Sequence, residues 1–80
     1  MEARDFGSTV TLYMPQPRSG PEPYVVLQER RSVGTFASRD DAMGFARSLA
    51  ASIRERQQVA VRMRIEDEAG EWTTCDPLDP

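Results

Sequence analysis

The chain has 80 residues, with 13 acidic and 10 basic side chains and a formal net charge of −3. A chain of this length forms one domain with a small core, and its single cysteine excludes an internal disulfide. Histidine is absent, so the commonest nitrogen ligand of metals and the commonest general base are both missing. We therefore expect neither a metal site nor a cofactor, and we expect that the chain is not an enzyme.

The first part of the chain predicts a strand and a loop. Val10, Leu12 and Met14 alternate with polar or aromatic residues, which predicts a strand over residues 8–14. Residues 15–23 contain four prolines and one glycine, which predicts an extended loop. No two of these prolines stand three apart, so the loop lacks the Pro-x-x-Pro spacing of SH3 ligands.

Two more short strands follow the loop. Residues 24–28 are rich in β-branched and aromatic side chains, and we expect this strand to continue to Arg30. Residues 32–36 predict the next strand, with the turn at residues 30–31 or 33–34.

A capped helix and a second alternating strand give the clearest pattern in the chain. Ser38 precedes Asp41 by three residues, which is typical of a helix start, and the helix is expected over about residues 39–56. Its apolar face consists of Ala42, Phe45, Ala46, Leu49 and Ile53. Alternation then predicts a strand over residues 58–66, a turn over 66–70 and a last strand over 71–75 that ends before Pro77.

The order β-β-β-α-β-β predicts an α+β fold, an antiparallel or mixed sheet with one helix on one face. We expect one domain over residues 1–80, with residues 24–76 as its sheet-plus-helix core and 77–80 as a tail. The side chains expected in the core are Val25, Leu27, Phe36, Phe45, Leu49, Ile53, Val61 and Met63. Gly44, inside the helix, is expected on its solvent side.

Three segments resemble a family of small bacterial proteins, the domain of unknown function 2188. The segments are residues 24–26 (Tyr-Val-Val), 36–42 (Phe-Ala-Ser-Arg-Asp-Asp-Ala) and 46–50 (Ala-Arg-Ser-Leu-Ala), within a likeness that covers residues 24–65. The chain departs from the family in its extra N-terminal strand, its longer helix exit and its acidic tail. The resemblance implies a sheet-plus-helix fold and no known activity.

Charge is unevenly distributed, and this directs attention to the arginines. Residues 30–64 hold eight arginines against three acids, whereas residues 65–80 hold six acids and no base. The candidate interaction surface consists of Arg30, Arg31, Arg62, Arg64 and Trp72. Arginine and aromatic side chains on a sheet suit single-stranded nucleic acid. We favour the alternative, in which Arg62 and Arg64 lie on a solvated face and pair with Glu66, Glu68 or Glu71.

Catalytic alternatives carry less weight. Cys75 lies near the end of a strand, and the acids Asp40 and Asp41 are explained by the positive end of the helix dipole. The sequence thus favours a non-enzymatic protein-interaction or regulatory module of bacterial or mobile-element origin, homodimeric through a sheet edge. A nucleic-acid-binding accessory protein is the alternative. No membrane partner is expected, since no apolar run approaches about 20 residues, and the expected compartment is the cytoplasm.

Overall fold

The computed structural model describes residues 9–76 and confirms an α+β fold with the order β-β-β-α-β-β. The elements are β1 (Thr9–Met14), β2 (Tyr24–Gln28), β3 (Arg31–Phe36), α2 (Arg39–Gln57), β4 (Ala60–Glu66) and β5 (Trp72–Cys75). The predicted first strand included residue 8, which lies outside the described residues, as does the predicted tail over residues 77–80.

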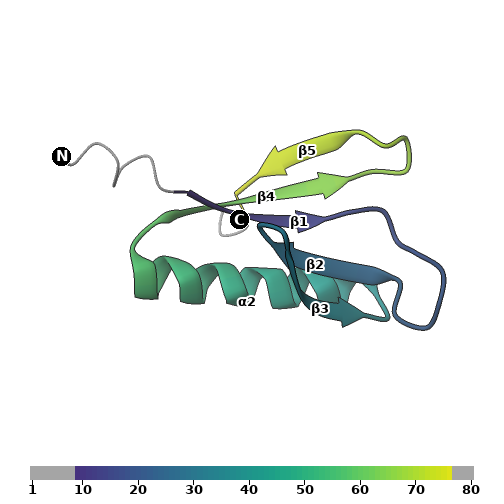
Figure 1. The fold of residues 1–80 in the computed structure, drawn as a ribbon, viewed down its shortest axis with the longest axis horizontal. Helices are drawn as coiled ribbons and strands as arrows, with labels where there is room; N and C mark the ends of the chain where they lie inside the picture. Colours follow the sequence, from purple (N-terminus) through teal and green to yellow (C-terminus); the bar gives the residue numbers. More distant parts are fainter. Residues whose placement is uncertain (1–8, 77–80) are drawn as a thin grey trace.

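The described strands form one mixed sheet in the order β3-β2-β1-β4-β5 (Figure 1). β1 and β4 pair in parallel at the centre, and the other neighbours pair antiparallel. Parallel neighbours need a crossover connection, and α2 lies in the connection that returns the chain from edge strand β3 to β4, beside β1. The first strand therefore belongs to the main sheet and lies at its centre.

Local signals fix both ends of α2. The Ser38 hydroxyl oxygen accepts a hydrogen bond from the Asp41 amide at 3.1 Å, as its capping position predicts. At the other end, Gln58 adopts a left-handed conformation with φ 53° and ψ 44°, and its amide donates to the Arg54 carbonyl at 2.8 Å. Because this cap occupies residue 58, β4 begins at Ala60 rather than at the predicted residue 58.

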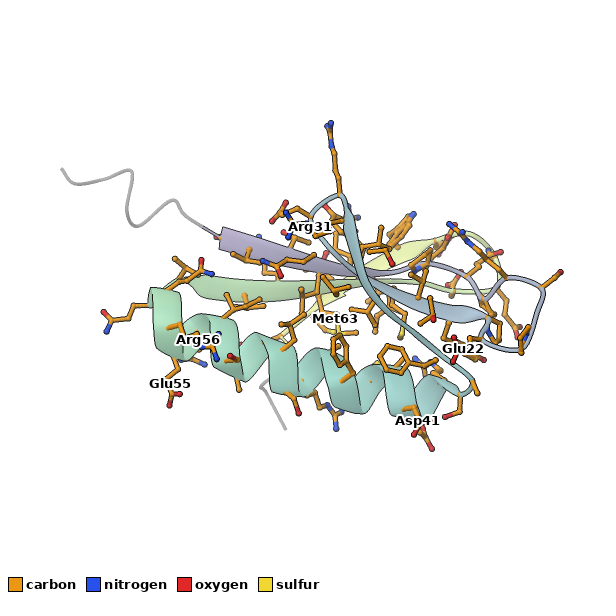
Figure 2. All side chains as sticks on the ribbon, turned by 60° about the horizontal axis from the view of Figure 1, so that its bottom comes forward. Glu22, Arg31, Asp41, Glu55, Arg56 and Met63 are labelled. Carbon is orange, nitrogen blue, oxygen red and sulfur yellow. The ribbon has the colours of Figure 1, made fainter. Side chains whose placement is uncertain are left out.

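The core lies between α2 and one face of the sheet. Ala42, Ala46 and Ala50 are fully buried at intervals of four residues, and these small side chains let the helix approach the strands closely. Figure 2 shows Met63 in the layer between sheet and helix, whereas Asp41 and Glu55 lie on the outer side of α2. The sheet contributes Leu12, Met14, Val26, Val61 and Met63 to this cluster.

Part of the predicted core was wrong. Leu27 is paired with Tyr13 on the face of the sheet that α2 does not cover, and it is only half-buried. Val26, which was not predicted, is fully buried on the helix side, because alternation along β2 points it to the opposite face. Of the other predicted side chains, Val25, Ile53, Val61 and Met63 are buried, and Phe36, Phe45 and Leu49 are half-buried against the cluster.

The β2–β3 hairpin also differs from its prediction. β2 ends at Gln28 instead of continuing to Arg30, because Glu29 turns the chain with φ 57°. The Glu29 amide donates to the Thr11 carbonyl at 2.9 Å. Val26 of β2 pairs with Gly34 of β3, and the next β2 residue, Leu27, pairs with Ser32. Val33 is therefore the extra residue of a β-bulge in β3.

Candidate interaction surface

One face of the sheet is left without a helix, and we call it the open face. Opposing residues of paired strands point to the same side, and the register pairs Tyr13 with both Arg64 and Leu27. The next residue pair on this face is Thr11 and Arg62. Trp72 of β5 pairs with Glu66, two residues beyond Arg64, and thus shares the face. Arg31 is exposed and pairs with Gln28 next to the turn of the β2–β3 hairpin.

Trp72, on edge strand β5, makes the aromatic and cation–π contacts of the open face. Its side chain is 38% exposed and is the exposed large hydrophobic residue of the described chain. The Tyr13 ring meets the indole edge to face, with centroids 6.0 Å apart and planes at 84°. The Arg64 guanidinium carbon lies 5.7 Å from the indole centroid, within the range of a cation–π contact. Two neighbouring strands therefore hold the indole in place.

A shallow hollow of about 590 Å³ lies beside Trp72. Apolar atoms from Leu27, Pro15 and the two aromatic rings line most of it, and Glu29 and Arg30 contribute one charge of each sign. Such a hollow offers an apolar contact for one side chain, with polar groups at its rim.

The carboxylates near the open face bond to backbone amides. Glu29 Oε1 accepts from the Thr11 amide at 2.7 Å, and Glu66 Oε1 accepts from the Gln16 amide at 3.1 Å. The expected pairing of Arg64 with Glu66 thus gives way to the contact with Trp72. The Arg64 Nε is buried and has no hydrogen-bond partner among residues 9–76.

The structure brings together some of the residues that the sequence singled out. Arg30, Arg64 and Trp72 surround the hollow or its aromatic wall. Arg62 is exposed farther along β4, and Arg31 opens β3 at the hairpin next to Arg30.

The candidate interaction surface predicted from the sequence did not include two of its members, Tyr13 and Leu27. Tyr13 lies on the same side of β1 as Thr9 and Thr11, and the alternation of side chains along the strand was the signal for its position. Leu27 had been assigned to the core. Its place on the open face depends on pairing with β1, which alternation within β2 alone does not show.

Residues 9–76 contain no group of three or more histidine, cysteine or acidic side chains that could hold a metal ion. Cys75 is a free, exposed thiol, and Asp40 and Asp41 are exposed in the first turn of α2. In the same part of the chain, no helix has the length and apolar character needed to cross a membrane.

Comparisons with models of protein families, with curated proteins and with solved structures found no match. The resemblance of residues 24–65 to the domain of unknown function 2188 stays a prediction. The functional proposal therefore depends on the geometry of the open face.

Proposed function

We propose that this protein is a non-enzymatic protein-interaction or regulatory module that binds a partner protein with its open face. The observation that carries this proposal is the exposed Trp72, held between Tyr13 and Arg64 beside the apolar hollow. Tryptophan, tyrosine and arginine are the residue types that most often dominate the energy of protein interfaces. Their gathering at one point of an open sheet face is typical of an anchor for a partner.

The position of these side chains on strands supports the same proposal. Tyr13 and Arg64 belong to the neighbouring strands β1 and β4, and every residue of β1 pairs with β4. Side chains that are already ordered lose little conformational entropy when a partner binds. The anchor is thus arranged before binding, and the hollow beside it offers room for an apolar side chain of the partner.

A second candidate function is binding of single-stranded nucleic acid. Arg30, Arg62 and Arg64 share the open face with two aromatic rings, a combination that serves backbone contacts and base stacking. Against it stand the net charge of −3 and the acidic turn between β4 and β5, which begins directly beside the Glu66–Trp72 pair. We therefore rank protein binding first.

A comparison of two variants tests protein binding. Tagged wild-type protein, Trp72→Ala and the control Arg47→Ala, which changes an exposed residue of α2, serve as baits for affinity capture. A captured candidate is then purified and titrated against each bait. We expect wild type and Arg47→Ala to bind alike, and Trp72→Ala to bind about tenfold more weakly or worse. Equal affinity of all three baits for the partner would contradict the proposed surface.

The nucleic-acid candidate needs a separate measurement. We expect wild-type protein to leave the fluorescence anisotropy of a labelled single-stranded oligonucleotide unchanged at low salt, where electrostatic attraction is strongest. Binding that is lost in Arg62→Ala/Arg64→Ala would instead favour this second function.

A further inference from the structure

We propose that a second copy of this chain pairs with β5, through an antiparallel, two-fold symmetric contact centred on Thr73. The two sheets then continue into one another across a seam of two β5 strands. This inference goes beyond the open face, because it names the sheet edge, the partner strand and the register. It depends on the backbone of β5, whereas the proposed function depends on side chains around the hollow.

β5 is an edge strand that carries neither a charged residue nor a bulge, although at four residues it is the shortest strand of the described sheet. All four of its residues are exposed, and its sequence Trp-Thr-Thr-Cys contains no charge, proline or glycine. The opposite edge strand, β3, begins with Arg31 and has a bulge at Val33. Charges and bulges are devices that prevent strands from pairing at an edge. Of the two edges of the described sheet, β5 is thus the one without a charge or a bulge that would prevent pairing with another strand.

The hydrogen-bond pattern of the β4–β5 hairpin shows which backbone groups of β5 face outward. The Asp67 amide donates to the Glu71 carbonyl at 2.9 Å, which makes this a hydrogen-bonded pair. Such pairs alternate along an antiparallel ladder. Thr73 and Cys75 lie two and four residues after Glu71, so they also form hydrogen-bonded pairs with β4. Their amides and carbonyls therefore point to β4. Trp72 and Thr74 direct theirs to the open edge.

These outward groups select one register. With the two-fold axis at Thr73, Trp72 of each copy exchanges amide-to-carbonyl bonds with Thr74 of the other. The bulky indole then faces a β-branched side chain, a favourable cross-strand pair. An axis at Trp72 would oppose two indoles directly. An axis at Thr74 would require Asp76, which lies beyond the end of β5.

The antiparallel arrangement also suits the charges and the shape of the molecule. It places the two acidic turns, with Asp67, Glu68 and Glu71, at opposite ends of the seam, so they do not repel one another at close range. The main contacts of α2 are with β2, β3 and β4, and Figure 1 shows β5 beyond β4 from the helix. A two-fold axis perpendicular to the sheet keeps both open faces on the same side, so the two Trp72 side chains line one larger surface.

A proline substitution tests the pairing. Thr74→Pro removes an amide that points outward and leaves the ladder to β4 intact, as proline is tolerated on an edge in that orientation. Thr74→Val is the matched control, because it keeps the amide and the β-branched shape. The mass of each protein is measured by light scattering over a roughly hundred-fold concentration range.

We expect wild type and Thr74→Val to change from monomer toward dimer as concentration rises, and Thr74→Pro to stay monomeric. A wild-type protein that is monomeric at every concentration, or a folded Thr74→Pro that still dimerises, would overturn the proposal. Circular dichroism confirms that each variant is folded.

Disulfide trapping tests the register. In a Cys75→Ser background, Thr73→Cys places two thiols opposite each other on the axis, at a non-hydrogen-bonded position where side chains approach closely. Thr74→Cys in the same background places its thiols opposite Trp72 instead. We expect mild oxidation to produce covalent dimers of the first variant and few of the second. Efficient crosslinking of Thr74→Cys alone would refute the axis at Thr73.

The two proposals can fail independently. If dimerisation fails, monomeric Thr74→Pro still carries Trp72 and the hollow, and its affinity for a captured partner still reports on the open face. If partner binding fails, the light-scattering and crosslinking results for β5 are unaffected.

Discussion

At the residue scale, two glycines differ in what surrounds them. A Cβ on Gly34 would lie 2.9 Å from Phe36 Cζ and 3.5 Å from Phe45 Cε2, whereas a Cβ on Gly44 would meet no atom within 4 Å. We expect Gly34→Ala to destabilise the fold by about 1–2 kcal/mol, because the Phe36 ring must move. Gly44→Ala should stabilise it by about 0.5–1 kcal/mol through helix propensity. Urea unfolding of both variants measures this difference, and equal stabilities would contradict it.

The contact between Arg64 and Trp72 can be followed by fluorescence, since Trp72 is the single tryptophan of the chain. Arg64→Ala removes the guanidinium over the indole and leaves the ring more exposed to water. We expect a red-shifted emission and a stability loss of about 0.5–1 kcal/mol. Arg62→Ala, the control on the same strand face, should change neither. An unchanged spectrum in Arg64→Ala would show that the contact does not persist in solution.

At the element scale, the start of α2 depends on one hydroxyl. The Ser38 oxygen accepts from the Asp41 amide at 3.1 Å, and Ser38→Ala leaves that amide without this partner. We expect a loss of about 1 kcal/mol in the free energy of unfolding. Ser48→Ala makes the same chemical change at an exposed position inside the helix and should be neutral or slightly stabilising. A similar loss in both variants would argue against the cap.

The β4–β5 hairpin depends on a single carboxylate. Asp67 Oδ1 accepts from the Ala69 amide at 2.8 Å and from the Glu71 amide at 2.9 Å. We expect Asp67→Ala to destabilise the protein by about 1–2 kcal/mol, and Asp67→Asn to retain most of the stability because its amide oxygen can accept the same bonds. Glu68→Ala is the control for lost charge in the same turn. Thermal unfolding of the three variants separates turn geometry from charge.

The elements were predictable because their signals are local. The capping serine and the periodic alanines of α2 lie within one segment, and the helix boundaries agree with the prediction to about one residue. Pairing between distant strands has no such signal. The parallel β1–β4 contact brings Tyr13 beside Arg64, and it decides which side of β2 carries Leu27. The arginines and Trp72 of the surface were therefore predictable, but the placing of Tyr13 and Leu27 beside them was not.

At the scale of the whole molecule, amide hydrogen exchange should show a gradient from the centre of the sheet to β5. β1 and β4 are paired on both sides, whereas β5 has one neighbour within the described chain, so exchange is expected to be slowest at Leu12 and Met63.

Within β5, the proposed dimer predicts a dependence on concentration that alternates along the strand. The amides of Trp72 and Thr74 face outward, so they should exchange quickly in dilute protein and more slowly as the concentration rises. The Thr73 amide, already bonded to β4, should respond little. Exchange measured by NMR at two concentrations, with Thr74→Pro as the monomeric control, distinguishes this pattern from general protection. A uniform slowing of all β5 amides would indicate association through another surface.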